Sequence, residues 1–196
     1  MPYSSFEDEK DALDNITNAM FSLDFLKFYT DSLANHELSQ KSIEYFYSSW
    51  LENRHISLQD PKIPFSLGAI LGYLYVGILY AKEGWYTLIP AQPLNQSIDW
   101  GTSTLIVNNP VNSNIQLNAF ARRIRNALGH GRIKINVPMD GTFTPDNVED
   151  TVSVTFKDVG RNPTDIFETT MKISELEKFI RKFQELIFAD VKSRIT

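Results

Sequence analysis

Residues 117–132 read LNAFARRIRNALGHGR. This stretch has the apolar spacing of a helix and is also rich in positively charged side chains. Apolar residues recur at the i, i+3, i+4 and i+7 spacing that places them on one face of a helix. Gly129 and Gly131 predict its end, because glycine favours the left-handed backbone that often terminates helices. The stretch therefore predicts an amphipathic helix over residues 114–129, capped near residues 112–114. Its apolar face comprises Leu117, Phe120, Ala121, Ile124, Ala127 and Leu128.

The polar side of this helix gathers cations in an otherwise acidic chain. The chain carries a net charge of -5, yet no carboxylate occurs between Asp99 and Asp140. A local group of cations in an acidic protein indicates an anion site, with phosphate as the first candidate, and the alternative is a solvated helix face. The basic residues of this window are Arg122, Arg123, Arg125, His130, Arg132 and Lys134.

Helical spacing brings three polar residues of this stretch to one face. Asn126 and His130 are four residues apart, and Arg122 lies one turn before Asn126, so all three lie off the apolar stripe. His130 is expected near the helix C-terminus, where the helix dipole favours its protonated form while neighbouring arginines oppose it. One end of one helix is therefore the candidate functional site.

Residues 125–130 read RNALGH, which resembles the R-x4-6-H motif of the HEPN superfamily. In that motif an arginine is followed by a polar residue, a short spacer and a histidine. Arg125 and His130 fit the four-residue form with Asn126 at the polar position, whereas Arg123 and His130 fit the six-residue form without the polar follower. The resemblance implies a helical bundle and a metal-independent ribonuclease, which in this superfamily is often a toxin or a phage-defence effector.

The resemblance also implies how such a site acts. The 2′-hydroxyl of RNA attacks its own phosphate, a reaction that needs no metal-activated water and no cofactor. His130 is expected to transfer protons, a role for which histidine is the most common side chain. Arg125 is expected to hold the phosphate, and Asn126 to orient His130 or the phosphate. The cations expected to bind RNA phosphates are Arg122, Arg123, Arg132 and Lys134.

Partners follow from the same resemblance. In the superfamily two protomers usually pair so that both motif helices face one cleft, which brings a second His130 to the site as a second proton-transfer group. RNA and a second copy of the chain are thus the expected partners, and an antitoxin or another regulatory protein is a further candidate. The alternative is a non-catalytic HEPN-like module that binds RNA, a nucleotide or a partner protein.

The rest of the sequence predicts a mainly α fold, a HEPN-like up-and-down helical bundle formed by a single domain over residues 1–196. Helices are expected over residues 8–34, 37–55, 65–83 and 174–193, the last with a capping box formed by Ser174 and Glu177. Alternating apolar residues predict a small antiparallel β-meander over residues 132–171, before the last helix. Residues 89–113 are expected to form a long loop flanked by Trp85 and Trp100, for which core packing is preferred over stacking on a base.

Residues 63–81 carry no charge and reach the length of a membrane span, but a buried helix is preferred because the other predicted helices are amphipathic. Gly68 and Gly72 are spaced to let a second helix approach closely. A membrane-associated helical protein is the alternative. The chain has no cysteine, which excludes disulfides and thiolate metal sites and fits a reducing compartment. We therefore expect a cytoplasmic protein with no membrane contact, no metal and no cofactor.

Overall fold

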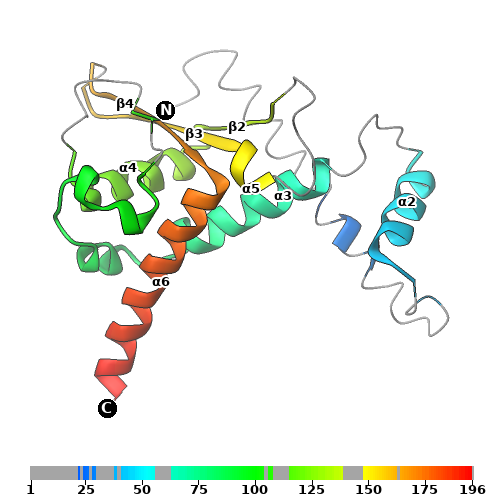
Figure 1. Cartoon of the computed structure of the whole chain (residues 1–196), viewed down its shortest axis with the longest axis horizontal. Helices are drawn as coiled ribbons and strands as arrows, with labels where there is room; N and C mark the ends of the chain where they lie inside the picture. The colour runs from blue at the N-terminus through cyan, green and yellow to red at the C-terminus, as the bar shows by residue number, and fades with distance from the viewer. Residues whose placement is uncertain are drawn as a thin grey trace. The chain divides into compact units, whose positions relative to one another are not determined.

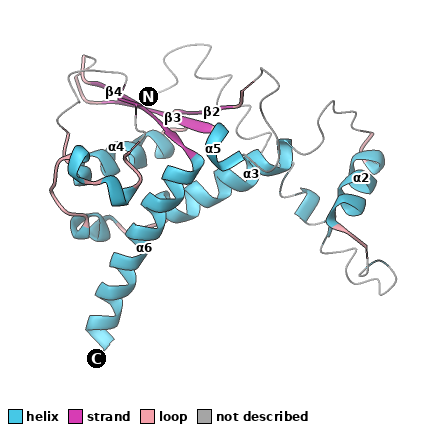
Figure 2. Ribbon diagram, viewed as in Figure 1, coloured by secondary structure: helices cyan, strands magenta, loops and turns pink. Residues whose placement is uncertain are grey.

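The computed structural model of the chain describes residues 22, 24–26, 28–29, 38, 41–55, 63–103, 106–107, 115–138, 148–162 and 164–195. The chain divides into two compact units, one formed by Leu13–Tyr73 and one that contains Leu74–Thr196 (Figure 1). It is mainly helical with a small antiparallel sheet before the last helix, which confirms the predicted fold class (Figure 2). The single domain over residues 1–196 stays a prediction.

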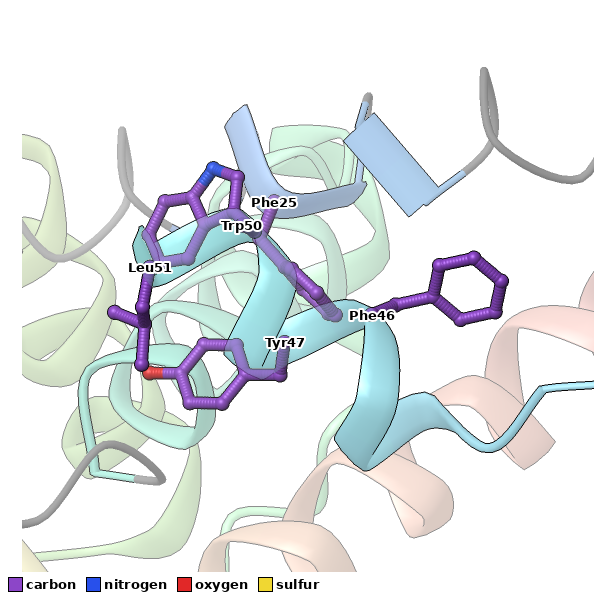
Figure 3. Packing of buried hydrophobic residues seen from close by; sticks show 5 residues of the cluster. All are labelled: Phe25, Phe46, Tyr47, Trp50 and Leu51. Carbon is purple, nitrogen blue, oxygen red and sulfur yellow. The ribbon is translucent and has the colours of Figure 1, made fainter. Parts of the chain in front are cut away.

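The smaller unit has an aromatic core on helix α2 (Ile43–Asn53). Ser42 caps this helix by accepting a hydrogen bond from the backbone N–H of Tyr45 at 3.3 Å. Phe25 packs edge-on against the rings of Tyr47 and Trp50 (Figure 3). Helix α2 lies inside the predicted range 37–55, whereas the predicted helix 8–34 falls largely outside the described residues. The buried cluster comprises Phe25, Phe46, Tyr47, Trp50 and Leu51.

Helix α3 (Ile63–Leu74) continues into a π-helical turn, η2 (Tyr75–Leu79), where one helix over 65–83 was predicted. Gly77 in this turn permits the close approach of helix α6 (Ile173–Ile195), because a Cβ there would lie 2.6 Å from Cγ2 of Ile180. Gly72, which was expected to serve such an approach, has no described neighbour within 4 Å of a Cβ. Within the part of the chain that the structure describes, no helix is both long enough and apolar enough to cross a membrane.

The larger unit holds a four-stranded sheet in the order β1-β4-β3-β2, with all three pairs antiparallel. The predicted meander is present as β2 (Ile133–Asn136), β3 (Ser153–Val159) and β4 (Ile166–Lys172). Strand β1 (Ile106–Val107) pairs with β4 from within the predicted loop. Two residues are too few to show an alternating pattern, so the sequence did not predict this strand.

Helix α4 (Leu117–Gly129) packs against β3, and its predicted apolar face is buried along its whole length. Phe120 of this helix contacts Phe167 of β4 and Phe179 of α6, with ring centroids 5.8 and 6.2 Å apart. The last helix begins at Ile173, one residue earlier than predicted. The hydroxyl of Ser174 lies 3.2 Å from a carboxylate oxygen of Asp150, to which it donates, and so does not act as the predicted cap.

The segment predicted as a long loop contains 3₁₀ turns instead: η4 (Leu94–Gln96) and η5 (Ile98–Trp100), preceded by η3 (Glu83–Leu88). Trp100 is buried against Phe179, which confirms its predicted role in core packing, whereas Trp85, for which the same role was predicted, is only partly buried. Gly101 follows with a φ of 75°, and a Cβ there would overlap the carbonyl oxygen of Glu175 in the first turn of α6. Close packing on α6, which local sequence does not reveal, therefore orders this segment.

Candidate functional site

Helix α4 ends at Gly129 as predicted, and the way it ends fixes the backbone of His130. The N–H of His130 donates to the carbonyl of Asn126 at 2.9 Å. The next two N–H groups, those of Gly131 and Arg132, bond to carbonyls of the last turn at 3.0 and 2.8 Å, and Gly131 has a φ of 65°. This pattern is the Schellman termination, which satisfies the last carbonyls of a helix. His130 therefore has a defined backbone and an exposed side chain.

The start of α4 differs from the prediction. The helix begins at Leu117 with Gln116 in the capping position, rather than at residue 114 with a cap near residues 112–114, which lie outside the described residues. The N–H of Leu117 donates to the carbonyl of Gln92 at 2.8 Å, and Gln116 forms an antiparallel bridge with Pro93. Contacts with Gln92 and Pro93 thus determine where this helix begins, and the local sequence around the helix start does not indicate them.

Arg125 lies between a carboxylate and an aromatic ring, both from η3. Its Nη1 is 2.7 Å from Oε2 of Glu83, and its guanidinium carbon lies 5.6 Å from the centroid of the Tyr86 ring. In the described part of the chain its buried Nε has no hydrogen-bond partner. An ion pair and a cation–π contact therefore orient the guanidinium, while Glu83 neutralises part of its charge.

Tyr86 is the buried support beneath this arginine. Its hydroxyl donates to the backbone carbonyl of Ile78. Burial raises the pKa of Tyr86 far above its usual range, the positive charge of Arg125 opposes that rise, and the negative charge of Glu83 adds to it. Tyr86 consequently stays neutral at any physiological pH, and its role here is to hold Arg125 rather than to transfer protons.

Arg122 lies on the same side of α4 and is half exposed. Its Nη1 is 4.0 Å from Oε1 of Glu83, so one carboxylate bridges Arg122 and Arg125. The predicted anion site rested on a window of sequence without acids, and Glu83 comes from outside that window. The site therefore presents less positive charge than the sequence implies. Periodicity gave no signal for this pairing, because Glu83 lies on a separate 3₁₀ turn.

Arg123 is paired with two carboxylates of the sheet region. Its Nη1 is 2.9 Å from Oδ2 of Asp158, and its Nη2 is 2.5 Å from Oδ1 of Asp165. Burial lowers the pKa of Arg123, but its hydrogen bonds to Asp165 and Asp158 and their charges outweigh this, so the net pKa is raised. Arg123 was predicted to bind phosphate, whereas its guanidinium is committed to these carboxylates. We therefore assign it a structural role.

Asn126 shares the carboxylate of Asp158 with Arg123. Its Nδ2 donates to Oδ2 of Asp158 at 3.4 Å. Asp158 is only 3% exposed and occupies one of the buried positions in the alternating pattern of β3. A charged residue in that register was the sequence signal that could have identified it. Through this contact the polar residue of the motif is coupled to the sheet.

His130, Arg132 and Lys134 lead from the end of α4 into β2. The carbonyl of Arg132 accepts a hydrogen bond from the N–H of Lys157 at 3.0 Å, which ties the segment after His130 to β3. Lys134 is exposed and lies opposite Thr155 in the register of β2 and β3. The backbone that follows the histidine is therefore anchored to the sheet.

Four of the predicted site residues thus fall into two contact groups, one around Glu83 and one around Asp158. The other three follow at the helix end and along the start of β2: His130, Arg132 and Lys134. An exposed imidazole can transfer protons, and an oriented guanidinium can bind and stabilise an anion. Among the residues described, no group of three or more His, Cys, Asp or Glu is placed to hold a metal ion. The chemistry that this arrangement supports is acid–base catalysis on an anionic substrate.

A family model described as HEPN pEK499 p136 matches residues 1–194 of the chain. No curated protein and no solved structure matches it. The matched region includes α4 and the residues around Glu83 and Asp158, and it leaves out only the last two residues of the chain.

Proposed function

The chain belongs to the HEPN pEK499 p136 family, and on that premise we propose that it is a metal-independent endoribonuclease. Family membership supports a HEPN-type nuclease or toxin module in general terms. The finer proposal is a cytoplasmic toxin or phage-defence effector that cleaves RNA and is controlled by an antitoxin or another regulatory protein.

The observation that carries the proposal is that Arg125 already holds an oxyanion, five residues before an exposed histidine. The carboxylate of Glu83 lies 2.7 Å from its Nη1, a distance at which a phosphate oxygen also binds arginine. A phosphate of RNA takes over or shares this position. His130, at the end of the same helix, is accessible to the bound strand.

In the proposed reaction the 2′-oxygen of RNA forms a bond to phosphorus, and the bond from phosphorus to the 5′-oxygen breaks. A general base takes the proton of the 2′-hydroxyl, and a general acid gives a proton to the leaving 5′-oxygen. His130 fills one of these roles. Arg125 stabilises the negative charge that develops on the phosphate, and Asn126, held by Asp158, orients the imidazole or the phosphate. The products are a 2′,3′-cyclic phosphate and a 5′-hydroxyl.

A homodimer completes this site. One histidine cannot easily act as base and acid in the same step, and each chain supplies one motif histidine. We therefore propose that a second His130, from a second copy of the chain, lies at the same site. The cations that hold the flanking phosphates in this arrangement are Arg122, Arg132 and Lys134.

Cleavage of RNA in the presence of EDTA tests the proposal. His130→Ala is expected to lower the cleavage rate by about 10²- to 10⁴-fold while RNA binding stays close to that of the wild type. Arg125→Ala is expected to weaken both, because its charge acts on the bound phosphate as well as on the transition state. His55→Asn is the matched control: it removes another exposed histidine, and asparagine tolerates the positive φ of 54° there. Cleavage by His130→Ala at the wild-type rate overturns the mechanism.

A non-catalytic RNA-binding module is the second candidate. The contacts of Glu83 favour it, because they neutralise part of the charge of Arg122 and Arg125 and leave less to stabilise a transition state. Tight RNA binding by the wild-type protein with no cleavage of single-stranded or structured RNA supports this candidate over the enzyme.

A further inference from the structure

Residues 79–86 lie along α4 and form one side of the candidate site. Cδ1 of Leu79 lies 3.5 Å from the position of a Cβ on Gly129, the residue before the motif histidine. Farther along, Glu83 pairs with Arg125, and the ring of Tyr86 supports the same guanidinium. Contacts at several points along the segment therefore hold it beside the motif helix.

This segment carries two aromatic side chains that its packing leaves accessible. Tyr80 is 87% exposed, and Trp85 is partly exposed. The ammonium group of Lys82 lies 5.5 Å from the centroid of the Trp85 ring. A single exposed tyrosine is ordinary on a protein surface. Here, however, two accessible rings and a cation lie on the short segment that also contacts Arg122 and Arg125.

We propose that Tyr80 and Trp85 form a nucleobase-stacking subsite for the RNA strand whose phosphate is held at Arg125. The ligand is an unpaired base, and the proposal rests on the proposed function for the identity of that strand. Aromatic side chains bind unpaired bases through their π faces, and adjacent cations bind the phosphates between them. Lys82, Arg122 and Arg125 supply those cations.

The subsite sets the substrate class. In a duplex the faces of a base are covered by its neighbours in the stack, so it cannot lie on a protein side chain without being extruded. An RNA with unpaired bases offers those faces freely. The inferred substrate is therefore a single-stranded segment or a loop, with one base on Tyr80 or Trp85 and the adjoining phosphate at the arginines.

Binding of an uncleavable strand tests this subsite apart from catalysis. The probe is a short 2′-O-methyl RNA, which keeps its bases and phosphates but has no free 2′-hydroxyl to attack. Tyr80→Ala is expected to weaken its binding by about 5- to 150-fold, the range for one base stacked on an aromatic ring. Tyr80→Phe, which keeps the ring, is expected to bind almost as tightly as the wild type. A version of the strand that lacks bases is expected to bind weakly and to be insensitive to Tyr80→Ala.

The fluorescence of Trp85 gives a second readout. Trp50 and Trp100 are buried, so quenching by a stacked base reports on Trp85, and Trp85→Phe is expected to remove it. Equal binding by the wild type and Tyr80→Ala, with no quenching, overturns the subsite while leaving the ribonuclease proposal intact. A loss of self-association in Tyr80→Ala with unchanged RNA affinity overturns it in favour of a protein contact. A wild-type protein that binds no RNA contradicts both proposals.

Discussion

At the scale of single residues, Glu83 decides how much positive charge the site presents. Its side chain is 57% exposed, so its ion pairs add little to folding, yet it occupies the position proposed for the phosphate. Glu83→Gln keeps the size of the side chain and removes the competing anion. We expect RNA to bind this variant more tightly by up to about 5-fold, measured by fluorescence anisotropy at fixed salt.

The control for that change is Glu185→Gln on α6, which removes the same charge from an exposed side chain that pairs with Lys182. It is expected to leave RNA affinity almost unchanged. Equal gains from the two variants mean that net charge alone, and not the contact with Arg125, governs binding.

Neighbouring arginines on α4 are expected to behave differently when each is replaced by alanine. Arg122 is half exposed and near the proposed phosphate, so Arg122→Ala should reduce the slope of log affinity against log salt by about 0.7, the value for one contact to a single strand. Arg123→Ala should leave that slope unchanged. Instead it should lower the free energy of unfolding by about 3 to 5 kcal/mol, because it leaves Asp158 buried without its cation.

Salt titrations of RNA binding and urea unfolding of both variants check this pair. If Arg123→Ala reduces the slope of log affinity against log salt and leaves the stability normal, Arg123 binds an RNA phosphate after all.

The motif at the end of α4 could be identified from the sequence because all of its information is local. Arg125, Asn126 and His130 lie within about one and a half helical turns. The two glycines at the end of the helix stand directly before and after His130. The carboxylates could not be assigned in this way. Glu83 and Asp158 are more than thirty residues from their partners, and only the packing of η3 and β3 on α4 brings them together.

At the scale of elements, two glycines in neighbouring turns are expected to respond in opposite directions to alanine. Gly77→Ala should destabilise the protein by about 1 to 3 kcal/mol, because the new methyl group would overlap Cγ2 of Ile180, which is attached directly to the Cβ of that residue and cannot easily move away. At Gly72 an added Cβ meets no described atom within 4 Å, and the residue lies in an α-helix, so Gly72→Ala should stabilise the protein by up to about 1 kcal/mol. Urea unfolding measures both, and a neutral Gly77→Ala means that α6 does not pack this closely on η2.

Regular elements with a buried face were predictable, and irregular ones were not. The stripes of α4 and α6 and the alternation of β3 repeat over enough residues to be recognised. The π-helical turn η2, the 3₁₀ turns and the two-residue strand β1 are too short for any period to appear. Their conformation depends on contacts such as that of Gly77 with α6, which lie outside the local sequence.

At the scale of the whole molecule, the two-histidine mechanism requires that two chains meet. We expect the protein to have twice the 22.4 kDa of one chain in solution, measured by light scattering at micromolar concentration. Mixed dimers with one His130→Ala chain should cleave far more slowly than the wild type if both histidines act. A strictly monomeric protein that cleaves RNA at full rate contradicts the shared site.

Cleavage of RNA by its own 2′-hydroxyl is the reaction on which the proposed roles of Arg125 and His130 depend, and two matched strands can test it. The wild-type protein is incubated in EDTA with a single-stranded RNA and with the same strand in 2′-O-methyl form, and the ends of the products are identified. We expect both strands to bind and only the RNA to be cut, with a 2′,3′-cyclic phosphate and a 5′-hydroxyl at the new ends. Cleavage of the 2′-O-methyl strand, or products with 5′-phosphate ends, would contradict it.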